Sequence, residues 1–438
     1  MMHQANPADD RVTTSRLAGE AEVARVTPGA LALARQITFV AAAVTIAFPV
    51  VWIAWLWPLR ETLDRSGTPL GGDFPVFYVT ARTAWRGGSD ALYSLQAQYS
   101  QLHLLFPSLA PESALPFLYP PFVAAFLRPL GALDYGEAFV CFTLFSLLLW
   151  GMTIVALRHS LPIFASAWRQ PATWWLIGSP LLWESLMGGQ VAIWSCAVLS
   201  VAWACLSRDR IVMAGAVLAL ATYKPNVLLF VGLGLLVRYP RMLLGGVLVA
   251  PLLLAAGWIG GGVHAWSDYL TMLRSAEAQH FVASPPFEKY HGLLRSTPWL
   301  RDHLLVAPSI LVGAFCAILI AVWWRRHRAR ADASLAVGLL IVIQALFNPY
   351  EPVYDLLPLT IAALLIADAI AARSRSEREP GWAARGALLL ILAEPHLSQW
   401  LAGPSGIQPF SLGLLIATAW IVRRRSAGES AQLGQRGG

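Results

Sequence analysis

Residues 36–57 read QITFVAAAVTIAFPVVWIAWLW, an apolar run without a single acidic or basic side chain. A helix needs about 20 such residues to cross the hydrocarbon core of a bilayer. Comparable runs recur as far as Val422 in a chain of 438 residues that is 57% hydrophobic and only 13% charged. Soluble proteins carry roughly a quarter charged residues. The sequence therefore predicts an all-α polytopic membrane protein, with residues 36–422 as a single domain.

The apolar runs predict a bundle of about 10–13 transmembrane helices. The candidate spans are residues 36–57, 136–157, 172–186, 190–206, 211–223, 226–237, 242–260, 305–324, 333–347, 355–371, 384–401 and 408–422. Several of them are shorter than a full crossing, as broken or tilted helices inside a protein can be.

Basic residues indicate the orientation. Most of the 32 Lys and Arg fall in residues 1–35, in 423–438 and in short connections such as Arg325-Arg326-His327-Arg328. Cytoplasmic loops carry such an excess. We therefore expect residues 1–35 to be a disordered cytoplasmic tail, 423–438 a second one, and the protein to lie in the inner (plasma) membrane. The net charge of +7 then reflects topology rather than binding of nucleic acid.

Polar turns rich in Pro and Gly fall on the opposite, external side. They are the loop 58–135, residues 187–190, residues 222–226, the loop 261–304 and residues 348–355. This shared side predicts an external site. Within the first loop, residues 74–85 alternate aromatic and basic side chains as an amphipathic helix in the headgroup region would. Residues 118–133 are interrupted by prolines and predict a re-entrant hairpin.

Asp73 follows Gly71 and Gly72, shortly after the first span. A carboxylate among aromatic neighbours at a membrane surface can act as a general base. It can equally cap the helix expected to start at Phe74. The residue type leaves both interpretations open.

Lys224 lies between Tyr223 and Pro225 within an apolar stretch. A lysine at membrane depth is costly unless it is paired or faces a cavity, which favours binding of an anionic group. Snorkelling to the interface is the alternative. If Lys224 binds the anion, we expect Lys224→Met to insert normally, with slightly higher stability, and to bind that anion more weakly.

Three further polar residues fall in the external turns. Gln190 can hydrogen-bond a polyhydroxylated ligand or close its turn, and Asp355 can belong to the site or cap the span that it opens. Glu351 shares the turn of Asp355. In the second loop the basic cluster Lys289, His291, Arg295 and Arg301 fits either a phosphate clamp or lipid headgroups.

Other motifs exclude some functions. The four cysteines all lie in apolar runs without a Cys-x-x-Cys pair, which indicates buried, inert thiols. The sequence contains no Walker loop and no His-Glu-x-x-His motif. It therefore shows no cytoplasmic nucleotide site.

Several short motifs occur in a fixed order along the chain. They are Asp73-Phe74, Gly87-Gly88-Ser89-Asp90-Ala91-Leu92-Tyr93, Tyr119-Pro120-Pro121-Phe122, Arg128-Pro129-Leu130, Gly189-Gln190, Tyr223-Lys224-Pro225 and Tyr354-Asp355. Through them residues 36–422 resemble the polyprenyl-phosphate-sugar-dependent membrane glycosyltransferases of the GT-C type, most closely the alpha-mannosyltransferase-like glycosyltransferase family 87. The chain departs from that family at Ala192, where the family often has an Asn.

The resemblance implies a hexosyltransferase that moves a hexose, with mannose as the first choice, from a polyprenyl monophosphate donor to an external cell-envelope glycan or glycolipid acceptor. Asp73 is then the catalytic base or a metal-coordinating group; a divalent metal is an open alternative, because Lys and Arg can neutralise a monophosphate. The candidate substrate-binding residues are Tyr78, Arg82, Tyr119, Gln190, Lys224, His291, Arg295, Tyr354 and Asp355.

Two other classes remain as alternatives, a lipid-linked sugar transporter or flippase and a non-catalytic membrane scaffold. A transporter predicts inverted repeats, and the sequence shows none. A scaffold gives no reason for the lysine in the apolar stretch or for the external acidic residues.

Overall fold

The protein is helical in the computed structural model. The structure describes residues 28–56, 69–88, 91–107, 115–166, 168–276, 278, 291–293, 306–327, 330–371, 398, 401–402, 405 and 409–419. The α-helices are α2 (Pro28–Leu56), α3 (Phe74–Trp85), α4 (Leu95–Leu105), α5 (Pro121–Leu127), α6 (Tyr135–Arg158), α7 (Arg169–Ile177), α8 (Pro180–Met187), α9 (Ala192–Leu206), α10 (Ile211–Ala219), α11 (Leu229–Arg238), α12 (Met242–Gly261), α13 (Ala265–Arg274), α16 (Val306–Arg326), α17 (Arg330–Phe347) and α18 (Pro358–Ala371).

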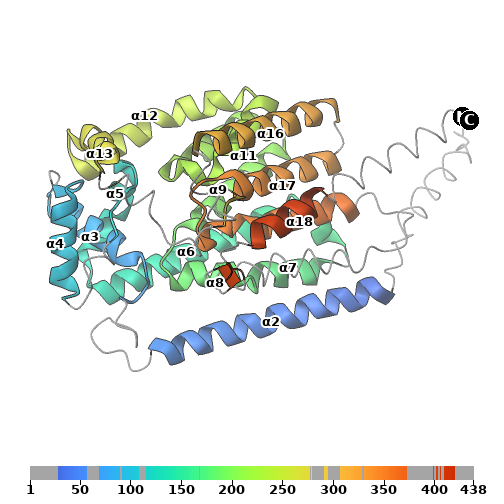
Figure 1. Ribbon diagram of the computed structural model, residues 1–438, viewed down its shortest axis with the longest axis horizontal. Helices are drawn as coiled ribbons and strands as arrows, with labels where there is room; N and C mark the ends of the chain where they lie inside the picture. The colour runs from blue at the N-terminus through green and yellow to red at the C-terminus, as the bar shows by residue number, and fades with distance from the viewer. Residues whose placement is uncertain are drawn as a thin grey trace, which may run out of the picture.

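Short 3-10 helices continue or join several of these elements. They are η3 (Arg128–Ala132), η4 (Pro162–Ala165), η5 (Leu220–Tyr223), η6 (Pro225–Leu228) and η9 (Val353–Leu356). A further apolar helix covers Pro409–Ala419. No β-strand occurs within the described ranges. Figure 1 shows the long helices side by side, with α3, α4, α5 and α13 gathered at one end.

Four helical segments are long and apolar enough to cross a membrane: Tyr135–Arg158, Met242–Gly261, Val306–Arg326 and Val353–Ile370. Only 28%, 17% and 22% of the apolar windows in the first three are buried, against 78% in the last. Leucines such as Leu148, Leu248 and Leu311 therefore stand exposed along α6, α12 and α16. Apolar surface of this extent is covered by lipid in a membrane protein. The predicted class, an all-α polytopic membrane protein, is confirmed.

Several predicted spans are shorter or broken. The span 172–186 is interrupted at Gly178 and Ser179, and Pro180 begins α8. A Cβ on Gly178 would lie 2.4 Å from the Ala41 carbonyl oxygen, so this glycine lets α2 approach the break. The predicted span 384–401 lies almost entirely outside the described residues.

Helix α2 begins at Pro28, inside the segment 1–35 that was predicted to be a disordered tail. Pro is favourable in the first turn of a helix, and the following residues Gly29-Ala30-Leu31-Ala32-Leu33-Ala34 are mostly strong helix formers. Helix propensity therefore extends the first helix beyond its apolar run.

Helix α3 begins at Phe74, as the sequence predicts, but it does not lie on the surface. Its residues Phe74–Ala81, Thr83 and Ala84 are buried, and only Trp85 at its end is exposed. Gly131 of η3 allows part of this enclosure, because its missing Cβ would lie 2.3 Å from the Ala81 carbonyl oxygen. Neighbouring segments thus cover the face that was expected to meet lipid headgroups.

Residues 118–133, where a re-entrant hairpin was expected, form one short helix, α5, continued by η3. Pro121 stands in the first turn of α5, where its missing N–H costs nothing. The helix packs between α3 and α12. Tyr119 lies two residues before this helix.

Candidate active site

Two doubled glycines bring distant parts of the chain together. Gly71, Gly72 and Gly189 all have positive φ angles, 83°, 54° and 57°. The Asp73 N–H donates to the Gly188 carbonyl at 3.1 Å. A Cβ on Gly189 would lie 2.5 Å from the Gly71 carbonyl oxygen. Only glycine fits this left-handed, close-packed contact, which sets Gly71-Gly72-Asp73 against Gly188-Gly189-Gln190.

Asp73 occupies the N-cap position of α3 without capping it. Its backbone is already helical, with φ −85° and ψ −8°, and its side chain makes no capping bond. Instead Asp73 Oδ2 accepts a hydrogen bond from Gln190 Nε2 at 2.6 Å and a longer one from the Tyr354 hydroxyl at 3.4 Å. The carboxylate therefore points toward the other polar turns, and the simple capping interpretation does not describe it.

Aromatic packing fixes the backbone next to Asp73. The Phe74 ring lies 5.4 Å from Tyr135, 5.2 Å from Phe139 and 5.2 Å from Phe142 of α6. Tyr135 in turn donates to the Leu70 carbonyl. Such rings contribute both buried area and preferred geometry. They hold the start of α3 on a long membrane helix, so that Asp73 has little freedom to move.

Lys224 is paired with Asp355. Lys224 Nζ lies 2.5 Å from Asp355 Oδ2, and both side chains are buried. The lysine lies in the non-helical break between η5 and η6, with φ −144° and ψ 76°. Pro225 lacks the N–H that would continue a helix. The break therefore exposes a cation to the interior of the protein, and Asp355 compensates it.

Tyr354 joins the ion pair to Asp73. Its ring centroid lies 5.4 Å from Lys224 Nζ, and its hydroxyl reaches Asp73 Oδ2. A cation over an aromatic face is attracted to it. Asp73 and Tyr354 are partly exposed, whereas Gln190, Lys224 and Asp355 are buried. The cluster thus presents Asp73 and Tyr354 to a ligand and holds the charged pair behind them.

Tyr119 shares this electrostatic environment. Burial raises the pKa of its phenol well above the usual range, and the nearby Asp355 and Asp73 carboxylates raise it further. Its ring packs at 5.2 Å from Phe77 of α3. Tyr119 is therefore a neutral hydrogen-bonding group next to both acids at physiological pH.

The turn 348–355 contains a second buried acid. Glu351 accepts a hydrogen bond from the Asn348 side-chain amide, and its carbonyl accepts one from the His291 N–H at 2.9 Å. Burial raises the pKa of Glu351 well above its usual range, the Asp355 carboxylate adds to the rise, and Asn348 and Lys224 oppose it. The raised pKa means that the buried position of Glu351 favours its protonated form.

The structure brings together Asp73, Tyr119, Gln190, Lys224, Tyr354 and Asp355 from the predicted set. Tyr78 has a different use, since its hydroxyl donates to the Leu133 carbonyl at 2.9 Å and supports η3. Arg82 is partly exposed near the far end of α3. His291 is buried, and its ring packs against Phe410 at 5.6 Å. Arg295 lies outside the described residues.

Sequence reasoning missed two supports of the Lys224 break. The Tyr223 hydroxyl bonds to Ser195 at 2.6 Å and to the Val191 carbonyl at 2.8 Å. On the other side, Gln344 accepts from the Phe230 N–H at 2.9 Å and donates to the Asn226 carbonyl at 2.5 Å. Gln344 thereby replaces hydrogen bonds that the broken helix lacks. A lone glutamine in the apolar span 333–347 was the available signal.

Among the residues that the structure describes, no group of three or more His, Cys, Asp or Glu side chains is placed so that it could hold a metal ion. Asp355 already neutralises Lys224. One of the three N–H donors of Lys224 is used in that pair, so the remaining ammonium donors and the hydroxyl of Tyr119 are the groups suited to an anionic ligand.

This fold and this site together define a class of protein. It is a polytopic, all-helical membrane protein with a fixed carboxylate beside a lysine ion pair. The model of glycosyltransferase family 87 matches residues 117–349, which is more than half of the chain, and the chain belongs to that family. No curated protein and no solved structure matches the chain. The matched segment includes Tyr119, Gln190 and Lys224, whereas Asp73 precedes it and Asp355 follows it.

Proposed function

We propose that this membrane glycosyltransferase moves a hexose, mannose in the first place, from a polyprenyl monophosphate to a cell-envelope glycan or glycolipid on the external side of the inner membrane. The observation that carries the proposal is the position of Asp73. Its carboxylate is withdrawn from helix capping and held by Gln190 and Tyr354, beside the Lys224–Asp355 pair. A base and a cation on one site suit a reaction that removes a proton and releases a phosphate.

Asp73 serves as the base. The acceptor hydroxyl gives its proton to the Asp73 carboxylate while its oxygen attacks the anomeric carbon of the donor sugar. The bond between that carbon and the phosphate oxygen breaks, and the electron pair leaves with the polyprenyl phosphate. Attack from the side opposite to the leaving group inverts the anomeric configuration. The Gln190 amide keeps the carboxylate in place by donating to Oδ2 at 2.6 Å.

Lys224 stabilises the departing phosphate. Its ammonium has three N–H donors, of which one reaches Asp355 Oδ2. Charge-assisted bonds to phosphate are about twice as strong as neutral ones. Tyr119 adds a neutral donor, and Arg295 in the second external loop is the further cation that the sequence offers. No step in this scheme requires a metal ion.

The charge pattern supports the external position of the site. The basic connections predict that the doubled-glycine turns, the Lys224 break and the turn 348–355 lie opposite the cytoplasm. Nucleotide sugars are confined to the cytoplasm, so a transferase that acts outside needs a sugar carried across the membrane on a lipid. A polyprenyl monophosphate donor meets that need, and its single phosphate matches one lysine.

Membranes that contain the protein, incubated with radiolabelled polyprenyl-phosphate-mannose and extracted envelope glycolipids, test the proposal. We expect labelled glycolipid from the wild type and about a hundredfold less from Asp73→Asn, which is typical of losing a general base. Asp134→Asn is the matched control, because Asp134 is an exposed acid at the start of α6 and Asn caps equally well. Equal transfer by wild type and Asp73→Asn would remove Asp73 from the mechanism.

A further inference from the structure

Two aromatic rings hold an arginine at the end of α11. The Arg238 guanidinium carbon lies 4.5 Å from the centroid of the Tyr239 ring and 5.4 Å from that of the Trp324 ring. The two rings meet edge to face at 5.4 Å, and Trp324 is buried in α16, which packs beside α11 (Figure 1). A guanidinium stacked on aromatic faces keeps its charge and the N–H donors in its plane. The rings therefore fix the orientation of this cation.

The stacked arginine lacks an acceptor. Arg238 Nε is buried and has no hydrogen-bond partner among the described residues, and no carboxylate among them forms an ion pair with it. A buried charged donor without a partner is costly. The side chain as a whole is half-buried, so that a ligand from outside the protein can reach it. An anion in the plane of the guanidinium supplies the missing partner.

Arg238 is remote from the candidate active site. Helix α11 begins shortly after Lys224 and contains 10 residues, with Arg238 as the last, which corresponds to about 15 Å along the helix axis. The arginine therefore lies at the other end of the bundle, on the side that the charge pattern predicts to be cytoplasmic.

Three further cations stand at this end. The Met242 N–H donates to the Tyr239 carbonyl at 2.9 Å, so the connection between α11 and α12 is a tight turn, and it carries the exposed Arg241. Arg325 and Arg326 are exposed in the last turn of α16. We call these three residues and Arg238 the Arg238 cluster. Its charge attracts an anion beyond the single stacked guanidinium.

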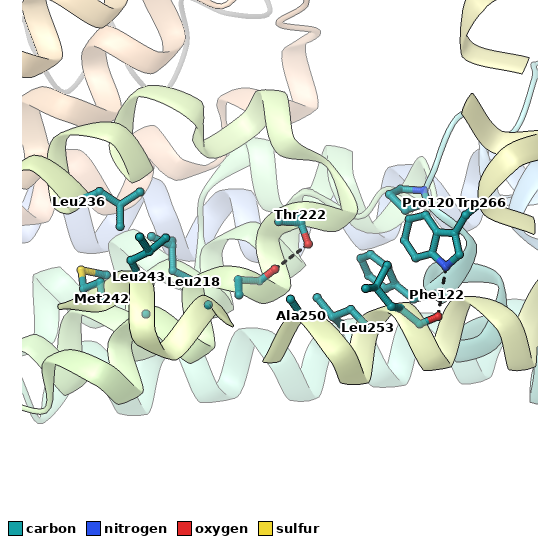
Figure 2. A pocket seen from close by; sticks show the side chains of 14 residues that line it. Pro120, Phe122, Leu218, Thr222, Leu236, Met242, Leu243, Ala250, Leu253 and Trp266 are labelled. Atoms are coloured by element: carbon teal, nitrogen blue, oxygen red, sulfur yellow. Dashed lines mark hydrogen bonds between the residues drawn. The ribbon is translucent and has the colours of Figure 1, made fainter. Parts of the chain in front are cut away.

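Lipid-facing side chains adjoin the Arg238 cluster. Leu236 of α11 and Leu243 of α12 are 37% and 61% exposed, and Figure 2 shows them at one end of an apolar groove along α12. Leu319 of α16 is exposed as well. A phosphate bound to the cluster thus has hydrocarbon-covered helices beside it, which is the setting of a lipid headgroup. A soluble phosphate compound has no use for these leucines.

We propose that the Arg238 cluster binds the phosphate of an anionic phospholipid, whose acyl chains lie against α11, α12 and α16. Arg238 donates in its plane to the phosphate oxygens, and the exposed arginines attract the rest of the headgroup. The headgroup is anionic rather than zwitterionic, because four cations face it, whereas Asp209 is the acid whose charge reaches the Tyr239 phenol. This interaction is independent of the reaction proposed at Asp73.

Native mass spectrometry of the full chain, released from detergent micelles, tests the proposal. The probes are dioctanoyl phosphatidylglycerol, the matching phosphatidylcholine and phosphatidylethanolamine, and glycerol 3-phosphate. We expect the wild type to bind phosphatidylglycerol in preference, and Arg238→Gln to bind it about tenfold more weakly. Arg238→Lys should lie between them, because an ammonium lacks the planar fork. Arg274→Gln is the matched control, because Arg274 is an exposed cation on α13 at the other end of the molecule, and it should bind as the wild type does.

Asp209→Asn separates an anionic headgroup from a zwitterionic one. Asp209 is exposed and has a φ of 56°, a left-handed conformation that Asn also adopts. Removal of its negative charge should strengthen binding of phosphatidylglycerol. If the bound lipid is instead phosphatidylethanolamine, the amine loses its partner and binding weakens, which would contradict the anionic headgroup.

Three results would overturn the assignment. Equal losses in Arg238→Gln and Arg274→Gln would indicate general charge attraction instead of a site, and unchanged binding in Arg238→Gln would remove the stacked arginine from it. Displacement of phosphatidylglycerol by an equal concentration of glycerol 3-phosphate would identify a soluble phosphate compound as the ligand. Should Arg238→Gln fail to fold, Arg241→Gln changes an exposed side chain; it should weaken phosphatidylglycerol binding, and unchanged binding would count against the cluster.

Discussion

The side-chain amide of Gln190 donates to Asp73 Oδ2 at 2.6 Å, although the two residues are 117 positions apart. Gln190 was a candidate for binding a polyhydroxylated ligand, but in the structure its side-chain NH2 group donates to the Asp73 carboxylate. The contact depends on the two doubled-glycine turns, which fix both backbones. Gln190 is therefore a positioning residue for the proposed base.

Replacing Gln190 should alter the protonation of Asp73. We expect Gln190→Ala to lower kcat about ten- to a hundredfold with a small change in KM, because the base loses its orientation. Gln190→Glu places a second acid beside Asp73, and like charges favour the protonated form. Its activity should therefore rise only at higher pH than that of the wild type. Transfer rates measured across pH with saturating donor check both results.

Gln98 provides the control for these variants. It is a buried glutamine of α4 whose amide donates to the Leu92 carbonyl at 2.8 Å, and its carbonyl accepts from the Phe117 N–H at 2.8 Å. Gln98→Ala should lower the thermal unfolding temperature without shifting the pH profile of transfer. An unshifted profile for Gln190→Glu would contradict the positioning role.

Gly189→Ala should disrupt the contact between the doubled-glycine turns. The added Cβ would lie 2.5 Å from the Gly71 carbonyl oxygen, at a residue with φ of 57°. The left-handed conformation alone costs roughly 1–2 kcal/mol for a non-glycine residue. We expect a lower unfolding temperature and reduced transfer. Gly136→Ala, where a Cβ meets no atom within 4 Å, should leave both unchanged; equal behaviour of the two variants would show that the contact is not needed.

Glu351 should make the stability of the protein depend on pH. Its pKa is raised in the folded state, so the folded protein holds a proton that the unfolded chain releases. Stability is then fully present below the ordinary pKa of a glutamate and is lost as pH rises toward the raised value. Gln resembles the protonated acid. We therefore expect Glu351→Gln to match the wild type at pH 4 and to unfold at a higher temperature at pH 8.

Thermal unfolding in detergent at pH 4, 6 and 8 measures this effect. Glu137→Gln is the control, because Glu137 is an exposed glutamate in the first turn of α6, and it should follow the wild type at each pH. If Glu351→Gln instead matches the wild type at pH 4 and unfolds at a lower temperature than the wild type at pH 8, the ionised carboxylate is the form that the turn requires.

Local signals in the sequence predicted much of the fold. The apolar runs located α6, α12 and α16 closely, because a helix in lipid must be both long and apolar. Asp73 before Phe74 correctly indicated where α3 begins. Pro120 and Pro121 were interpreted as interruptions of a hairpin, whereas Pro121 begins α5. The same signals could not show that α3 is buried, since its enclosure depends on η3 and α6, which come much later in the chain.

The site was predicted as a set of residues but not as a set of pairs. The sequence placed Asp73, Gln190, Lys224 and Asp355 in turns on a common side, where Pro and Gly interrupt the helices. Which of them meet is decided by the packing of whole helices, and Lys224 and Asp355 are 131 positions apart.

The Lys224–Asp355 pair reverses one expectation from the sequence. Lys224→Met was expected to raise stability slightly, as removal of a lone cation from an apolar stretch would. The lysine is in fact bonded to Asp355 Oδ2, while Asp355 Oδ1 is buried and accepts no hydrogen bond within the described part of the chain. Lys224→Met therefore leaves an uncompensated buried carboxylate. We expect it to destabilise the protein by about 3–5 kcal/mol.

A double-mutant cycle tests this pairing. Asp355→Leu alone strands the lysine and should cost a similar amount, whereas Lys224→Met with Asp355→Leu replaces both charges by apolar groups and should recover most of the stability. Unfolding temperatures in detergent measure the cycle. The double variant should nevertheless lack transfer, because the cation for the donor phosphate is gone. Additive losses in the double variant would show that the two residues stabilise the fold independently, and normal transfer by it would move the phosphate site toward Arg295.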